Sequence, residues 1–201
     1  MSSTASPYVQ PMALVPCTDS GDRLRIALDR AWIISDTHFL HTRLAEVYEA
    51  PARQTLGIDH NDAMIERWQR TVRDNDLVVH LGDLALGAKD DFAAISEQLP
   101  GRKVLIKGNH DKRSRRWYAD HGFEVIPPFW LDYAGWRVRF QHTPDYDRAH
   151  VRYPRVLICH GHIHSKETGD PRQINLSVEV IDFTPRRLVG VLDERISQLT
   201  R

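Results

Sequence analysis

In the first half of the chain, short apolar runs alternate with longer amphipathic segments. The runs at residues 31–35, 77–81 and 103–107 are continuous, as in strands that are buried on both faces. Between them, apolar residues recur every three or four positions, which predicts helices over residues 61–72, capped by Asn61, and 92–99. Strands that alternate with helices form parallel sheets, so this order restricts the chain to a few architectures.

The second half of the chain has more strand patterns than helix patterns. Predicted strands cover residues 123–131 and 136–142, and further strand segments lie at 155–159, 173–180 and 188–192. Their spacing is typical of an antiparallel meander. Together the two halves predict an α/β sandwich of two packed sheets with helices on the outside.

The length of 201 residues fits one domain. Three prolines interrupt the first sixteen residues, so we expect residues 1–22 to form a loose N-terminal arm. Alternating apolar and polar residues from Leu24 to Leu28 then indicate a strand. We therefore expect residues 23–201 to form a single domain.

Composition excludes several classes of function. Lys plus Arg and Asp plus Glu both number 27, so the charge gives no reason to expect a dedicated nucleic-acid-binding surface. No apolar run approaches the roughly 20 residues of a membrane span. The N-terminus lacks the pattern of a signal peptide, and two cysteines, Cys17 and Cys159, do not make a disulfide framework. These features predict a cytoplasmic protein, and none of them indicates an oligomeric state.

Polar motifs follow five of the apolar runs, each where a strand is expected to end. They supply oxygen and imidazole groups, and the chain has 11 histidines in all. Because ligands of open α/β sheets bind beyond the carboxyl ends of the strands, we expect these side chains to share one rim. The candidate metal ligands are Asp36, His38, Asp83, Asn109, His142, His162 and His164.

Seven ligands are more than one metal ion uses, but they suit two ions that share a carboxylate. The mixture of oxygen and imidazole favours Mn²⁺, with Fe, Zn²⁺, Ni²⁺ or Co²⁺ as alternatives, and the absence of thiolates argues against a structural zinc site. Two ions about 3.5–4 Å apart clamp the attacking and leaving oxygens at phosphorus. They also lower the pKa of a bridging water, so that a hydroxide nucleophile exists near neutral pH.

The set and order of these motifs resemble the calcineurin-like metallophosphoesterase family. The motifs are Asp-x-His, Gly-Asp, Gly-Asn-His-Asp, a single His and Gly-His-x-His, and they span residues 36–164. Within the family, the sequence is most similar to small single-domain bacterial and phage phosphoesterases. The resemblance implies a sandwich of two packed mixed β-sheets flanked by helices.

The resemblance also implies a role for each motif residue. One ion would be held by Asp36, His38, Asp83 and His164, and the other by Asp83, Asn109, His142 and His162. Asp83 would therefore bridge the two ions. His110 and Asp111 are the candidate catalytic residues: His110 would stabilise charge on the phosphoryl group or protonate the leaving oxygen, and Asp111 would position that side of the site.

The implied activity is metal-dependent hydrolysis of a phosphate ester. Because no cap domain is inserted, we favour a phosphodiester or a nucleotide as substrate, with a phosphomonoester or a phosphoprotein as the alternative. A non-catalytic scaffold is a third reading, and the complete ligand set argues against it. Leu84 and Thr143-Pro144 depart from the residues often found at these positions in the family, which affects substrate contacts rather than the metals.

Several other features have two readings. His80 and His160 are interpreted as packed or supporting histidines, and His41, His60, His121 and His150 as surface residues, with the rim as an alternative for His41. The basic run 112–116 is either a solvated helix face or a patch that steers phosphate toward the site. The segment 143–154 is either a lid over the substrate or a polar loop.

Overall fold

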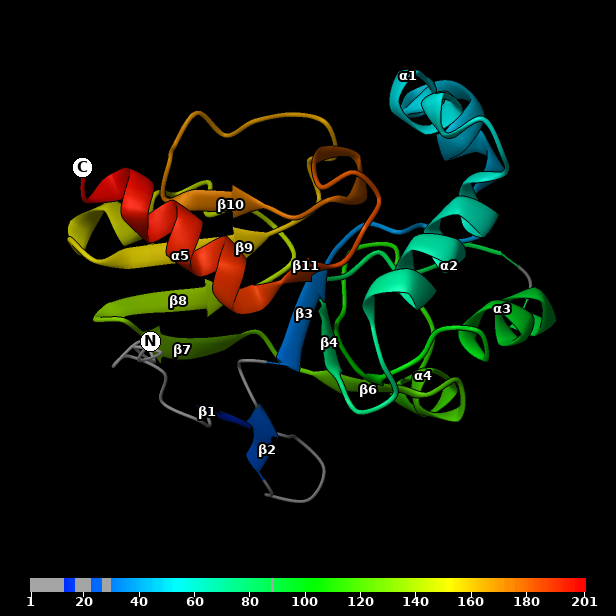
Figure 1. Cartoon of the computed structure of the whole chain (residues 1–201), viewed down its shortest axis with the longest axis horizontal. Coiled ribbons are helices and arrows are strands. Elements are labelled where there is room, and N and C mark those ends of the chain that lie inside the picture. Colours follow the sequence, from blue (N-terminus) through cyan, green and yellow to red (C-terminus); the bar gives the residue numbers. More distant parts are fainter. Residues whose placement is uncertain (1–12, 17–22, 27–29, 88) are drawn as a thin grey trace, which may run out of the picture.

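The structure is a computed structural model that describes residues 13–16, 23–26, 30–87 and 89–201. Two large sheets form its centre, with strand orders β11-β3-β4-β5-β6 and β10-β9-β8-β7 (Figure 1). The strands of the first sheet are β3 Ala31–Ile34, β4 Leu77–His80, β5 Arg102–Ile106, β6 Phe123–Ile126 and β11 Arg186–Arg187. Those of the second are β7 Phe129–Tyr133, β8 Trp136–Phe140, β9 Val156–His160 and β10 Gln173–Asn175.

In the five-stranded sheet, β3, β4, β5 and β6 are parallel and β11 is antiparallel to β3. Helices α2 (His60–Thr71), α3 (Lys89–Ser96) and α4 (Arg115–Asp120) lie beside this sheet (Figure 1). The predicted alternation of strands and helices is therefore confirmed. The cap of α2 differs from the prediction: the carboxylate of Asp59, not the side chain of Asn61, accepts the free N–H groups at the start of the helix.

The four-stranded sheet is less antiparallel than predicted. Only β7 and β8 form an antiparallel pair, while β8, β9 and β10 run parallel. The meander prediction was wrong because the segments 141–155 and 161–172 carry the chain back across the sheet, so that each next strand starts at the same end. Both sheets are thus mixed.

Three predicted strands were also wrong in their extent or type. Residues 123–131 are divided between β6 and β7, which belong to different sheets, because Pro127-Pro128 has no N–H to donate to a ladder. Residues 188–192 begin helix α5 (Leu188–Leu199), in which the buried Leu188, Val191 and Leu192 have the three- and four-residue spacing of a helix face. Only the first part of 173–180 is a strand, and a 3₁₀ turn follows at Val178–Val180.

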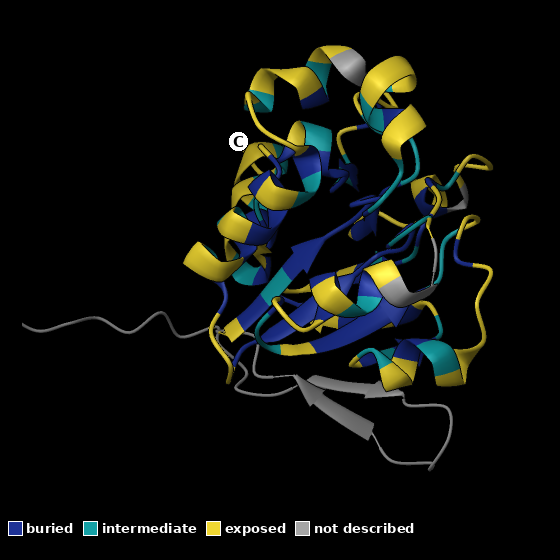
Figure 2. Cartoon of the chain, turned by 90° about the vertical axis from the view of Figure 1, so that its right-hand side faces the viewer, coloured by how far each residue is buried: buried dark blue, intermediate teal, exposed yellow. Residues whose placement is uncertain are grey.

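Buried apolar residues of both sheets join in one core. Strands β4 and β9 are wholly buried, and β3, β5 and β6 are nearly so. Exposed residues alternate with buried ones in β7, and both residues of β11 are exposed. The helices expose their outer faces (Figure 2). The short helix α1 (Ala50–Arg53), a π-helical segment at Leu44–Tyr48, and 3₁₀ turns at Gln54–Leu56 and Ala149–Arg152 complete the main body. No helix in the described part of the chain is long and apolar enough to span a membrane.

At the N-terminal end, β1 (Ala13–Pro16) pairs antiparallel with β2 (Arg23–Ile26). The described part of the strand predicted at 24–28 is thus a strand, and residues 27–29 lie outside the described residues. Of the arm predicted for residues 1–22, β1 is the part that the structure describes.

Candidate metal centre

Backbone hydrogen bonds join the loops that follow the strands of both sheets. The N–H of Asp36, after β3, donates to the carbonyl of Gly82, after β4, at 3.0 Å. The N–H of Gly161, after β9, donates to the carbonyl of His142, after β8, at 2.9 Å. The two sheets are connected at the same place, since the N–H of His162 donates to Asp36 Oδ2 at 2.9 Å. The strand ends therefore meet at one rim, as the sequence predicted.

The glycines of the motifs allow this close approach. A Cβ atom at Gly161 would lie 2.0 Å from Asp36 Oδ2, and one at Gly82 would lie 2.6 Å from His142 Nδ1. Any side chain at these positions would push a candidate ligand out of place. The motifs thus need glycine next to their polar residues for a steric reason.

Most of the candidate ligands have a left-handed backbone. The φ angles are 57° at Asp36, 46° at His38, 55° at Asp83, 74° at His162 and 51° at His164. This conformation is unfavourable for residues with a Cβ, and it occurs where the surrounding structure imposes it, often at functional sites. The rim therefore holds these five side chains in strained positions.

The side chains at the rim form two adjacent groups. Asp36, His38 and His164 bring ligand atoms that all lie within 4.8 Å of one another, and so do Asp83, His142 and His162. Asp83 lies between the groups, because its Oδ2 is 3.5 Å from His38 Nε2 and 3.4 Å from His142 Nε2. The seventh candidate, Asn109, joins the second group through Oδ1, which lies 2.9 Å from His142 Nε2.

The groups have the chemistry that divalent cations require. Both ring nitrogens of His38 are buried and have no hydrogen-bond partner among the described residues, and a coordinated ion would give one of them a partner. Burial lowers the pKa of His38 to about 2, so its ring is neutral and can act as a ligand. Burial alone would raise the pKa of Asp83, but His142 and the N–H of His110 outweigh it and hold that pKa well below its ordinary value. The residues present therefore fit two divalent ions that share the Asp83 carboxylate.

Two supporting residues were not found from the sequence. Glu179 Oε1 lies 3.3 Å from Nδ1 of His164 and 2.6 Å from Nη2 of the buried Arg53. Arg53 also donates to the backbone carbonyls of Asp36 and Thr37. A carboxylate on the far nitrogen of a histidine fixes the tautomer and orientation of the ring. Arg53 ends a helix, and Glu179 falls inside the segment 173–180 that was predicted to be a strand, so the strand-end argument had no signal for them.

The two candidate catalytic residues have different surroundings. His110 is exposed at the rim, with its ring centroid 5.4 Å from that of His38, and its N–H donates to Asp83 Oδ1 at 2.8 Å. Asp111 is buried, and its Oδ2 accepts from the N–H groups of Asp83 and Gly108, both at 2.7 Å. Asp111 thus faces the backbone that carries Asp83, whereas His110 faces the site.

The other histidines give a mixed outcome. His80 is buried and contacts Thr37 Oγ1 and the N–H of Gly82, and His160 is buried with Nδ1 near the carbonyl of Gly161, in line with supporting roles. His41 lies at the rim, with its ring centroid 5.6 Å from that of His38. The surface prediction was wrong for His60, which shares a helix face with Met64 and Trp68, and for His150, which lies between two carboxylates.

The chain is similar to several known proteins. The chain is 31% identical over 169 residues to an uncharacterized protein of Methanocaldococcus jannaschii. The matched region covers 80% of this chain and 88% of that protein. It is 28% identical to the gene 66 protein of Mycobacterium phage D29, over 83% of this chain and 99% of the phage protein. A protein of unknown function from Aquifex aeolicus has a similar structure, with a TM-score of 0.64, 25% identity, and coverage of 81% of this chain and 97% of that one. The family model described as calcineurin-like phosphoesterase matches residues 30–190, and the chain therefore belongs to that family.

Proposed function

We propose that this protein hydrolyses phosphate esters at a centre of two divalent metal ions and that it prefers phosphodiesters. Metal-dependent phosphoester hydrolysis is the general activity of its family. The observation that carries the proposal is the pair of ligand groups on either side of Asp83, since two neighbouring ions are suited to in-line displacement at phosphorus.

The residues of the rim would divide the work as follows. Asp36, His38 and His164 would hold one ion, Asn109, His142 and His162 the other, and Asp83 both. When bound, the ions would polarise the phosphoryl oxygens and make a hydroxide nucleophile available near neutral pH. His110 would donate a proton to the leaving oxygen from its exposed position, while Asp111 would keep the backbone of Asp83 in place.

Two hollows next to the site support the preference for diesters. One of about 580 Å³ borders His162 and His164, and another of about 210 Å³ borders His110. A phosphodiester carries a substituent on each side of the scissile phosphorus, and each hollow offers room for one. A phosphomonoesterase or protein phosphatase is the alternative, and a scaffold without activity would have no use for the complete ligand set. Mn²⁺ as the native metal and a cytoplasmic location stay predictions from the sequence.

A comparison of a diester with its matching monoester tests this proposal. The protein is supplied with Mn²⁺, and hydrolysis of bis(p-nitrophenyl) phosphate is measured beside that of p-nitrophenyl phosphate. We expect the diester to be turned over faster, and a chelator to abolish the reaction. Faster turnover of the monoester would establish the phosphatase alternative, and no turnover of either ester with both metals bound would contradict the proposal.

A further inference from the structure

The larger hollow is continuous with the candidate metal centre. His162, Ile163 and His164 form part of its lining, so two of the candidate ligands open directly into it. The segment 144–148 and the segment 166–170 form further walls. A group attached to a phosphoryl unit at the rim would therefore extend into this space.

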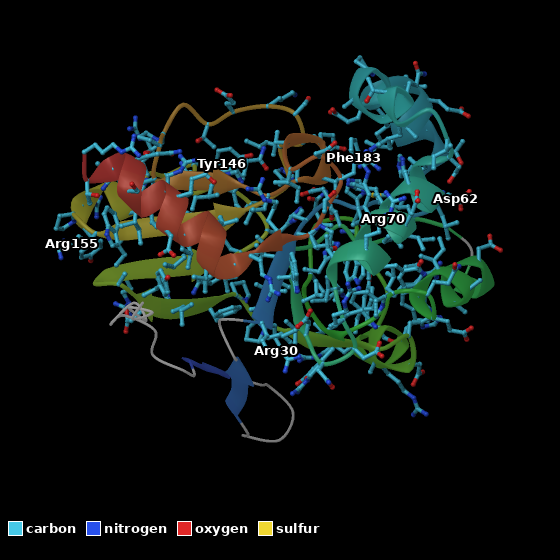
Figure 3. The ribbon with its side chains drawn as sticks, in the orientation of Figure 1. Arg30, Asp62, Arg70, Tyr146, Arg155 and Phe183 are labelled. Atoms are coloured by element: carbon cyan, nitrogen blue, oxygen red, sulfur yellow. The ribbon has the colours of Figure 1, made fainter. Side chains whose placement is uncertain are left out.

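Tyr146 gives the hollow an aromatic surface. Its side chain is 66% exposed and lies over the four-stranded sheet, next to the connection between β9 and β10 (Figure 3). The ring is not used in the apolar core, and it borders a space large enough for a second ring. Flat rings stack on tyrosine irrespective of their substituents, so this position suits a heterocyclic base.

The rest of the lining is polar and mixed in charge. Arg148 and Lys166 bring cations, while Glu49 and Glu167 bring carboxylates. Gln173 lies in the same lining and is held in place, because its Oε1 accepts from the N–H of Asp145 at 2.7 Å. With Asp145 and Asp170, the lining holds four carboxylates and two cations, so a polyphosphate would meet more acidic than basic groups. Base edges and sugar hydroxyls, which both donate and accept hydrogen bonds, match this lining.

A buried histidine fixes the distance between two walls of the hollow. His150 Nδ1 lies 2.6 Å from Asp145 Oδ2, and its Nε2 lies 3.0 Å from Asp170 Oδ2. Asp145 belongs to the segment with Tyr146, and Asp170 belongs to the segment 166–170. Arg148 adds a weaker link, with Nη2 3.7 Å from Asp170 Oδ2. The hollow is therefore preformed, not dependent on a loop that must close.

We propose that this hollow binds the nucleoside part of a nucleotide ester, with Tyr146 stacked on the base and His150 as the positioning residue that sets the width of the pocket. The proposal rests on the proposed phosphoesterase function, since the scissile phosphorus would lie at the metal centre. It adds the substrate class and the residues that select it. It also assigns the segment 143–154 a place in a pocket wall, where the sequence left a lid or a polar loop open.

Two esters with the same leaving group test the pocket. One is the p-nitrophenyl ester of thymidine 5′-monophosphate, and the other is methyl p-nitrophenyl phosphate. We expect the protein with Mn²⁺ to have the higher kcat/KM for the nucleoside ester, and Tyr146→Ala to reduce this preference about tenfold or more. Tyr153→Ala is the matched control, because Tyr153 is 62% exposed in the same segment but lies outside the lining. An unchanged preference in Tyr146→Ala would overturn the proposal.

A binding measurement separates the pocket from the chemistry. Calorimetric titration with thymidine 5′-monophosphate is compared with titration with inorganic phosphate. Inorganic phosphate carries no nucleoside that could fill the hollow. We expect tighter binding of the nucleotide, lost in Tyr146→Ala and kept in Tyr153→Ala, even if neither ester is hydrolysed. Equal affinity for nucleotide and phosphate would contradict the pocket, whereas nucleotide binding without hydrolysis would contradict only the proposed function.

His150→Leu tests the positioning role. Loss of the contacts with Asp145 and Asp170 should raise KM for the nucleoside ester several-fold while lowering kcat much less, because the metal ligands are untouched. KM for the methyl ester should change little, since that substrate does not fill the hollow. An equal rise of KM for both esters would show that His150 acts on the fold in general, not on the pocket.

Discussion

Buried histidines differ in what their ring nitrogens contact, and His80 and His38 are the two extremes. Both nitrogens of His80 have partners, in Thr37 and Gly82, so its position is explained by the hydrogen bonds alone. Among the described residues, His38 is the histidine with neither buried nitrogen partnered. A buried polar atom without a partner is costly, which makes His38 the clearest sign that the rim is built for ions.

His110 is the residue whose loss should reduce catalysis without disturbing the metals. His110→Ala is expected to lower turnover of an aryl diester by about 10²–10⁴-fold, the usual contribution of general acid–base catalysis. Metal content, measured by mass spectrometry of the purified variant, should be unchanged because the candidate ligands are intact. Loss of metal would instead identify His110 as a ligand.

Asp111 should matter for stability as well as for the site. Its carboxylate accepts from the N–H groups of Asp83, Gly108 and Leu84 and from the hydroxyl of Tyr118. Asp111→Asn places an amide against these donors and should lower the free energy of unfolding by at least about 2 kcal/mol. Urea unfolding in the presence of chelator measures this without a contribution from bound metal.

Tyr118→Phe is the milder companion to this change. It removes one of the hydrogen bonds to Asp111 and should cost about 1 kcal/mol. Equal stability of Asp111→Asn and the unmodified protein would show that these contacts do not hold the loop. Metal affinity of the folded Asp111→Asn protein should also fall, since Asp83 loses its support.

At the scale of the elements, strand patterns were interpreted best where strands are buried on both faces. The runs that became β3, β4 and β5 were located correctly, because continuous apolar residues bounded by polar motifs leave little choice. Residues 123–131 were not located correctly, because apolar residues continue on both sides of the Pro127-Pro128 pair. At this pair the chain leaves one sheet for the other. In α5, the five residues 188–192 are too few to show the spacing of a helix, which becomes clear over the whole segment Leu188–Leu199.

The turn between α2 and β4 depends on a single carboxylate. Asp76 accepts from Nε1 of Trp32 and from the N–H of Arg73, both at 2.9 Å. Burial would raise its pKa, but these hydrogen bonds and the charges of Arg187 and Arg30 outweigh burial and lower the pKa below its ordinary value of 3.8. Because the folded pKa is depressed, this stabilisation is present above pH 3.8 and is lost as the pH falls through the folded value.

Asp76→Asn should therefore be less stable near neutral pH by about 1–3 kcal/mol and should lose less stability on acidification. Urea unfolding at a series of pH values checks both effects. Asp74→Asn, in the same turn but exposed, is the control and should change little. If Asp76→Asn shows the same acid dependence as the unmodified protein, the account of this turn is wrong.

For the molecule as a whole, the sequence predicted the residues that lie near strand ends, and it missed the contacts between residues far apart in the chain. Each candidate ligand follows a strand within a few residues, so the rim could be predicted from strand ends and the topology of parallel sheets. Arg53 ends helix α1 and Glu179 lies in the 3₁₀ turn after β10, and their contacts with His164 and Asp36 exist only in the folded chain. The same holds for the contacts of His150, which join two segments that line the hollow.

The central claim is that one carboxylate joins two metal ions in a centre that hydrolyses phosphate esters. The most direct test is a titration of chelator-stripped protein with Mn²⁺, in which bound metal and turnover of an aryl diester are followed together. We predict two equivalents of bound Mn²⁺ and turnover that rises with them, and weaker binding of both ions in Asp83→Asn but not in Asp62→Asn, an exposed control on α2 (Figure 3). One equivalent at saturation, or an Asp83→Asn protein that binds both ions as tightly as before, would contradict the account.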